Sequence, residues 1–176
     1  QAPALRAVAN GLIAIVLEQA ATGGGTTGIS GGAIWIPTNF RMQEFGIPDS
    51  REQALEYLSH ATFGQSTPEL LEAYVDNCNV MLEFIRSHGI DWTIGQAFQD
   101  YYPQFPGGVP EGRGLWPIST IEGASGGGAL ARMLQQAGEA AGVQYMFSTP
   151  ARRLILNDDG SVAGVQAEAD GQEVNV

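Results

Sequence analysis

The sequence has no lysine, one cysteine and two histidines, and each shortage excludes a class of chemistry. Without lysine there is neither a Schiff-base nucleophile nor the lysine of a Walker phosphate-binding loop. Cys78 has no partner for an internal disulfide, so a reducing, cytoplasmic compartment fits the chain. His60 and His88 lie too far from each other and from Cys78 in the sequence to resemble a metal site, so we expect no bound metal.

Positive charge is also scarce. All eight basic residues are arginines, against 19 acidic residues, and the formal net charge is −11. Because binding to nucleic acid needs a basic surface, we do not expect a nucleic-acid partner. No apolar run approaches the roughly 20 residues of a membrane-spanning helix, so we do not expect one. The remaining composition is typical of a globular chain that can bury one sizeable core.

Both ends of the chain resemble interrupted elements. Residues 1–11 read as the later part of a helix that Asn10 and Gly11 terminate, and residues 171–176 read as part of a strand. We therefore expect residues 1–176 to be one partial domain of a longer protein. The predicted order of elements is helix, strand 12–17, an insert at 40–122, helix 126–141, strand 143–147 and hairpin 151–169. That order indicates an α/β fold.

The glycine-rich stretch 23–39, GGGTTGISGGAIWIPTN, is the strongest candidate for a ligand site. It contains six glycines, which cost backbone entropy and give a core no side chains, so they indicate close approach to a ligand. A short apolar strand precedes it and ends at Glu18. An acid at this place in a dinucleotide-binding sheet accepts hydrogen bonds from ribose hydroxyls, although Glu18 fits a surface acid equally well.

Three matches to short motifs are ambiguous. Residues 23–28 satisfy G-x-G-x-x-G, but the residues after Gly28 do not read as a helix, which argues against a true dinucleotide fingerprint. Ser30 and Ser125 both lie in G-x-S-x-G, the pattern of a nucleophile elbow. Ser30 lacks the following helix, Ser125 lacks a preceding strand, and no histidine comes after Ser125. A serine hydrolase is therefore a minor alternative.

The insert combines helices with an aromatic loop. Asp49 or Ser50 caps a predicted helix that runs to residue 59, and Thr67 with Pro68 begins a second helix that ends at Gly89. Residues 95–118 read as mostly loop. Their five aromatic residues fit the lining of a site for a flat apolar ligand; they are Phe98, Tyr101, Tyr102, Phe105 and Trp116.

The combined pattern resembles a known family. The stretches that carry the resemblance are 16–18, 24–27, 30–37, Asn39, 100–103, 106–108, 112–113 and 127–165. Together they are similar to the FAD-dependent oxidoreductases that include fumarate reductases and 3-ketosteroid dehydrogenases, most of all to the 3-ketosteroid Δ1-dehydrogenase branch. The resemblance implies a fragment of a Rossmann-like FAD-binding domain, with the insert 40–122 lining the substrate side. The family's first strand and its phosphate-binding glycine loop have no counterpart in residues 1–176.

The resemblance also implies a role for each matching residue. Glu18 binds the ribose of the FAD adenosine, and the main chain of Ala151 holds the adenine. The remaining implied cofactor contacts are Gly25, Thr26 and Thr27 beside the pyrophosphate and ribityl chain, and Ser30, Gly31 and Gly32 against the isoalloxazine.

The implied catalytic residue is Tyr102, whose hydroxyl supports the base that removes a proton from C2 of a 3-ketosteroid-like substrate, while flavin N5 accepts hydride from C1. An aromatic residue packed in a proline-rich loop is the structural alternative. The implied partners are an apolar ketone and an electron acceptor. Alternatives are a fumarate or succinate-type reductase, for which Arg113 is the only cation in the aromatic segment, and a flavin-free binding module on the same fold. We expect the isolated 176-residue chain to bind FAD weakly or not at all and to be inactive by itself.

Overall fold

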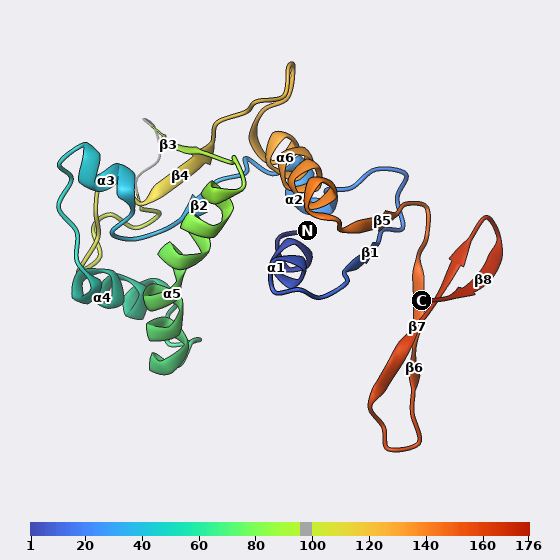
Figure 1. Ribbon diagram of the computed structural model, residues 1–176. Helices are drawn as coiled ribbons and strands as arrows, with labels where there is room; N and C mark the ends of the chain where they lie inside the picture. Colours follow the sequence, from blue (N-terminus) through green and yellow to red (C-terminus); the bar gives the residue numbers. More distant parts are fainter. Residues whose placement is uncertain (96–99) are drawn as a thin grey trace. The chain divides into compact units, whose positions relative to one another are not determined.

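The computed structural model describes residues 1–95 and 100–176 (Figure 1). The chain forms two compact units. Unit 1 consists of Gln1–Ile29 and Ala131–Val176, and unit 2 of Ser30–Leu130. The predicted insert, 40–122, falls within unit 2, whereas Phe98 lies outside the described residues.

Unit 1 contains a parallel pair of strands, the element expected of a Rossmann-like sheet. Strand β1 (Ile15–Leu17) pairs in parallel with β5 (Gln144–Met146), with Ile15 opposite Gln144. Parallel strands need a long crossover connection, and helix α6 (Gly126–Ala141) leads directly into β5. Unit 1 also contains helices α1 (Ala2–Ala9) and α2 (Gly25–Ile29).

The end of the chain forms an antiparallel three-stranded sheet in unit 1, the β6-β7-β8 meander in Figure 1. Its strands are β6 (Ala151–Leu156), β7 (Val162–Ala169) and β8 (Gln172–Asn175). The register between β6 and β7 shifts between Ala151 and Arg153. The hairpin predicted at 151–169 is confirmed, with its turn at residues 157–161.

In the part of unit 2 that the structure describes, helices and the start of α6 accompany a second antiparallel sheet, of order β2-β4-β3. Its elements are β2 (Ile34–Trp35), α3 (Phe40–Glu44), α4 (Arg51–Ala61), α5 (Pro68–Ser87), β3 (Trp92–Ile94) and β4 (Gly114–Pro117). Apolar side chains from α5 and the sheet, among them Leu82, Trp92 and Leu115, are at most 1% exposed and form its core. The predicted caps are confirmed, since the Ser50 side chain accepts from Gln53 N–H and that of Thr67 from Leu70 N–H.

Three elements escaped prediction. Helix α3 begins at the buried cap Asn39, and β4 lies inside the segment expected to be mostly loop. Helix α2 begins at Gly25, before the residues that argued against a helix, and lasts only five residues. The G-x-G-x-x-G match at 23–28 thus overlaps a single short helical turn that ends at Ile29, and no longer helix directly follows it. Among residues 1–95 and 100–176, no helix has the length and apolar character needed to cross a bilayer.

Candidate functional site

Unit 1 has a cavity of about 400 Å³ bordered by Glu18 and by the glycine run that begins at Gly23. Glu18 directly follows β1, and its main chain is held on both sides: its N–H donates to Met146 O (2.9 Å), and its carbonyl accepts from Thr149 N–H (2.8 Å). Its carboxylate Oε1 accepts from Ala20 N–H at 2.8 Å. The backbone of the sheet therefore fixes where this acid meets the cavity.

The glycine run places main chain that no side chain covers at the same cavity. Gly24 has a φ of +125°, and a Cβ there would lie 3.2 Å from the Ala131 Cβ on α6, so a larger residue does not fit without strain. A Cβ at Gly25 would meet nothing within 4 Å, and Gly25, Thr26 and Thr27 are exposed. Gly25 and Thr27 line the cavity with Glu18. The same cavity thus contains an acid that suits sugar hydroxyls and an accessible main chain that suits a phosphate.

Ala151, the predicted adenine contact, is the exposed first residue of β6. It lies on an outer strand of the β6-β7-β8 sheet, next to the register shift. This position offers main-chain groups rather than a side chain, as the prediction requires.

Unit 2 has an aromatic cavity of about 640 Å³ formed by α4, α5 and the loop after Asp100. The rings of Trp35 and Tyr57 stack in its wall, with centroids 5.7 Å apart. Its lining residues are Trp35, Tyr57, Leu58, Ala61, Thr62, Ser66, Leu70, Leu71, Tyr74, Tyr101 and Tyr102. Leu70 and Tyr74 of α5 are 61% and 42% exposed, so this part of the helix lines the cavity instead of the core.

A second cavity of unit 2, about 480 Å³ in volume, is lined by Ser30, Gly31 and Gly32 and by aromatic rings. Trp35 and Tyr101 belong to both cavities, which are therefore neighbours. We call the first the aromatic cavity and the second the glycine cavity. The structure thus brings the predicted flavin-ring residues of unit 2 next to the predicted substrate lining.

Gly32 is required by the backbone around it. Its φ is +73°, and a Cβ would lie 2.6 Å from Gly126 C and Gly127 N at the start of α6. Ser30 O accepts from Gly127 N–H (3.0 Å), and Ser30 Oγ accepts from Gly32 N–H (3.1 Å). Gly31, in contrast, has open space where a Cβ would stand.

Neither serine forms a nucleophile elbow. Ser30 leads into strand β2 instead of a helix, and Ser125 precedes α6 but follows a turn, with the nearest upstream strand, β4, ending at Pro117. The strand, turn and helix that the elbow requires in immediate succession are absent at both positions.

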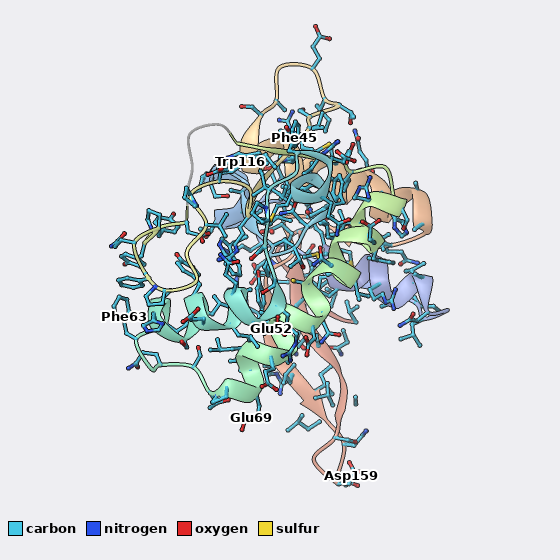
Figure 2. The ribbon with its side chains drawn as sticks, turned by 90° about the vertical axis from the view of Figure 1, so that its left-hand side faces the viewer. Phe45, Glu52, Phe63, Glu69, Trp116 and Asp159 are labelled. Carbon is cyan, nitrogen blue, oxygen red and sulfur yellow. The ribbon has the colours of Figure 1, made fainter. Side chains whose placement is uncertain are left out.

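Tyr102, the predicted catalytic residue, lies at the aromatic cavity with its side chain partly exposed. Its ring stacks on Phe105, with centroids 4.8 Å apart, and meets the edge of Phe63 at 5.8 Å. Phe63 lies just beyond the end of α4 (Figure 2). The Tyr102 N–H donates to Tyr57 Oη at 3.3 Å.

Tyr57 and Tyr74 are cavity residues that the sequence did not identify as functional. The Tyr74 hydroxyl donates to the Trp35 carbonyl, and burial raises the pKa of Tyr74 to about 12. Burial also raises the pKa of Tyr57, although its hydrogen bond with Tyr102 N–H acts in the opposite direction. Both phenols are therefore neutral at physiological pH. Nothing in the sequence around either tyrosine indicates a cavity.

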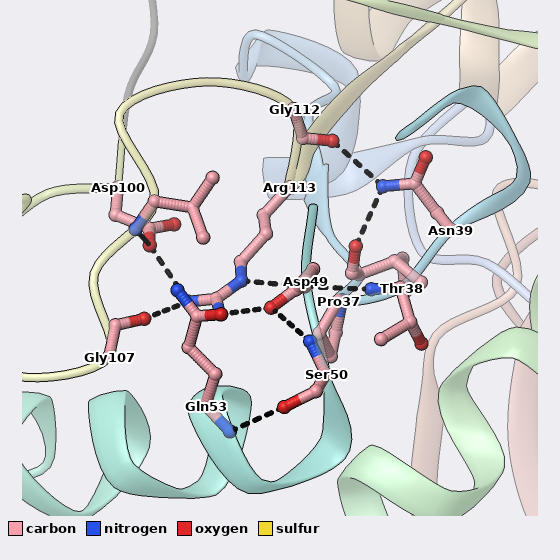
Figure 3. A network of polar contacts seen from close by, with 12 residues as sticks. Pro37, Thr38, Asn39, Asp49, Ser50, Gln53, Asp100, Gly107, Gly112 and Arg113 are labelled. Carbon is pink, nitrogen blue, oxygen red and sulfur yellow. Dashed lines mark hydrogen bonds and ion pairs between the residues drawn. The ribbon is translucent and has the colours of Figure 1, made fainter. Parts of the chain in front are cut away.

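Arg113, the only cation of the aromatic segment, forms ion pairs with two buried carboxylates (Figure 3). Its Nη2 and Nε contact Asp49 at 2.5 and 2.9 Å, while Nη1 contacts Asp100 Oδ2 and Gly107 O, both at 2.9 Å. The side chains of all three charged residues are at most 1% exposed. A dicarboxylate substrate would have to displace these partners, so Arg113 does not offer the cation that a fumarate-type site needs.

Asn39, another position that carries the family resemblance, is hydrogen-bonded to the residue before Arg113. The Asn39 amide donates to Ile36 O and Gly112 O, both at 2.8 Å, and its Oδ1 accepts from Met42 N–H at the start of α3. The separated stretches that carry the family resemblance in unit 2 therefore meet in one buried polar network.

Comparison with known proteins decides the family. Residues 2–176 match the family described as FAD binding domain. The chain belongs to this family. Its cofactor is accordingly FAD, and the flavin-free alternative finds no support. The unit 1 cavity fits part of that group, because Glu18 and the open backbone at Gly25 suit its sugar and phosphate.

Named relatives point in the same direction. The chain is 37% identical over 114 residues to a 3-oxosteroid 1-dehydrogenase of Comamonas testosteroni, and 40% identical over 118 residues to one of Mycolicibacterium smegmatis. Each alignment covers 65% of this chain and 20% of the relative, so the chain spans about a fifth of the length of these curated relatives.

A solved structure confirms the fold. The 3-ketosteroid Δ1-dehydrogenase of Sterolibacterium denitrificans, determined with 1,4-androstadiene-3,17-dione, superimposes with a TM-score of 0.89 at 24% identity. The match covers 99% of this chain and 43% of that one. The predicted α/β, Rossmann-like FAD-binding fold is thus confirmed.

Proposed function

We propose that the protein containing this chain is an FAD-dependent dehydrogenase that introduces a C1–C2 double bond into a 3-ketosteroid-like substrate. The observation that carries the proposal is the pair of neighbouring cavities in unit 2. The aromatic cavity, which Tyr102 lines, suits a flat apolar ketone. The glycine cavity beside it has room at Gly31 for a flat ring to approach the backbone closely.

The proposal gives each part of the chain a separate task. Glu18 would accept hydrogen bonds from ribose, the main chain of Gly25, Thr26 and Thr27 would hold the pyrophosphate and ribityl chain, and Ala151 would hold the adenine. Ser30, Gly31 and Gly32 would hold the isoalloxazine. The insert 40–122 supplies the lining of the substrate cavity.

Tyr102 would act where the reaction needs a proton removed. Its hydroxyl supports the base at C2, an acid site because the 3-keto group withdraws electrons from it. FAD, when bound, would supply the hydride acceptor, its N5 atom, for the hydrogen at C1. The aromatic walls offer the substrate an apolar surface. An electron acceptor then has to reoxidise the cofactor, and its identity lies outside this proposal.

A fumarate or succinate-type activity is the less favoured alternative, because Arg113 is held by Asp49 and Asp100. We also propose a reducing, cytoplasmic location, which rests on Cys78 being a buried free thiol.

The test uses the full-length protein, reconstituted with FAD. Dye reduction is followed with a 3-ketosteroid and, in parallel, with succinate. We expect reduction with the steroid alone and its loss in Tyr102→Phe. Turnover of succinate without steroid turnover, or an unaltered rate in Tyr102→Phe, would contradict the proposal.

A further inference from the structure

The loop that carries Tyr102 is held from two sides by groups whose contacts extend into the rest of unit 2. One is the Tyr57 hydroxyl, which accepts the Tyr102 N–H at 3.3 Å. The other is the Asp100 carboxylate, two residues before Tyr102. Both Tyr57 and Asp100 are nearly inaccessible, at 4% and 5% exposure. Such burial leaves them little freedom to move.

Asp100 is anchored through both carboxylate oxygens. Oδ1 accepts from the Trp35 indole N–H at 2.6 Å, while Oδ2 accepts from Val109 N–H and Arg113 Nη1, both at 2.9 Å. Arg113 also binds Gly107 O, so the loop is tied close to both of its ends. Charge-assisted hydrogen bonds of this kind are stronger than neutral ones, and burial strengthens them further.

Tyr57 is anchored by its ring. It stacks on Trp35 at 5.7 Å, and the Arg113 guanidinium lies 5.5 Å from its centroid. Trp35 and Arg113, which hold Asp100, therefore also hold Tyr57. The backbone on either side of Tyr101 is thus fixed against one rigid group of side chains, while the Tyr102 ring rests on Phe105.

We propose that Tyr57 and Asp100 are positioning residues for Tyr102: Tyr57 holds its main-chain N–H, and Asp100 holds the loop before it. The inference rests on the proposed function of Tyr102. Tyr57 acts through Tyr102 and does not itself exchange a proton with the substrate. A small displacement of a catalytic group lowers the rate strongly, which gives these contacts their value.

The decisive experiment is a double-mutant cycle in the full-length, FAD-loaded protein. Tyr57→Phe keeps the stacked ring and removes only the hydroxyl that accepts the Tyr102 N–H. We expect Tyr57→Phe to lower kcat with a 3-ketosteroid about fivefold, as the loss of one neutral hydrogen bond suggests, with a smaller change in KM. The double variant Tyr57→Phe/Tyr102→Phe should be no slower than Tyr102→Phe, because residues that act as one unit are not additive.

A purely structural role predicts a different pattern. If Tyr57 only stabilised the fold, the two effects on kcat would multiply in the double variant. Leu82→Val, in the core of α5 and in neither cavity, is the matched control: it lowers the thermal midpoint and leaves kcat unchanged. Asp100→Asn serves as the second variant, with the same expected coupling to Tyr102.

The outcomes separate the two proposals. A fully active Tyr102→Phe contradicts the proposed function, and this inference falls with it. A slow Tyr102→Phe combined with multiplying effects, or with unchanged kcat in both Tyr57→Phe and Asp100→Asn, contradicts this inference alone.

Discussion

Arg113 and Asp100 form an ion pair from which solvent is excluded, with Nη1 and Oδ2 2.9 Å apart and neither side chain exposed. Asp49 completes the group, so two carboxylates share one guanidinium. Such a group is stable only while all its members are present, because an unpaired buried charge is very costly.

Replacing Arg113 should therefore unfold unit 2 more readily than any surface change. We expect Arg113→Met to lower the free energy of unfolding by about 3–5 kcal/mol, since two carboxylates lose their cation. Urea denaturation measures the change. Arg51→Gln, which removes an exposed ion pair with Asp76, is the control and should leave the midpoint nearly unchanged. Equal midpoints for both variants would contradict this account.

The two adjacent glycines of the glycine cavity should respond differently to alanine. Gly32→Ala places a Cβ 2.6 Å from the α6 backbone at a positive φ, so we expect a clear loss of stability in thermal denaturation. Gly31→Ala meets no atom within 4 Å and should leave the stability of the apoprotein unchanged. If Gly31 faces the flavin ring as proposed, Gly31→Ala instead weakens FAD binding in a fluorescence titration. Unaltered FAD affinity in Gly31→Ala would argue against that placement.

Substitutions at Gly138 and Tyr145 should have strongly non-additive effects on the free energy of unfolding. A Cβ on Gly138 would overlap Tyr145 Oη, a buried hydroxyl without a hydrogen-bond partner among the described residues. Gly138→Ala alone should cost about 1–3 kcal/mol through overpacking. In a Tyr145→Phe background the same change should be neutral or should stabilise by up to about 1 kcal/mol, as expected for alanine in a helix. Denaturant titration of the four proteins gives the coupling energy, and additive effects would refute the contact.

The raised pKa of Tyr74 predicts that the folded protein loses stability at alkaline pH. Its pKa is about 12 in the folded protein against 10 for an ordinary tyrosine, so the unfolded chain releases this proton first. The stabilisation from Tyr74 is complete below pH 10 and declines as the pH rises toward 12. Tyr74→Phe should therefore lose less stability between about pH 8 and 11 than the unaltered protein. If the denaturation midpoints of Tyr74→Phe and the unaltered protein changed with pH in parallel, the prediction would be wrong, because Tyr74 would then have the same pKa in the folded and unfolded chain.

The isolated 176-residue chain should not retain FAD in a one-to-one ratio. It supplies Glu18 and open backbone for sugar and phosphate, but the cavity they border has no basic residue in its lining among the described residues. The absorbance spectrum after gel filtration tests this prediction, and stoichiometric flavin would contradict it.

Local signals predicted most helices and the final hairpin. Ser50 and Thr67 cap their helices through bonds to residues three positions later, so a short window of sequence contains the whole interaction. Strand β4 was missed because Gly114–Pro117 pairs with strands that begin about 20 and 80 residues earlier in the chain.

Within the candidate site, too, local relationships could be predicted from the sequence and contacts between distant residues could not. Glu18 and the glycine-rich stretch follow a strand directly, so their neighbourhood was predictable, although their roles stay proposals. Arg113 was predictable only as an available cation. Its partners lie 64 and 13 residues away, and only the fold shows that it is already engaged. Tyr57 lies 45 residues before Tyr102, and nothing nearby in the sequence indicates that its hydroxyl meets Tyr102.

The place of Trp35 in the wall of both unit 2 cavities has a practical consequence. Its indole donates to a carboxylate, stacks near two tyrosines and lies 5.3 Å from a guanidinium, so its electronic surroundings are unusually polar on one side and aromatic on the other. A molecule entering either cavity changes those surroundings. The fluorescence of this tryptophan should therefore change when a molecule occupies either cavity, without any attached dye.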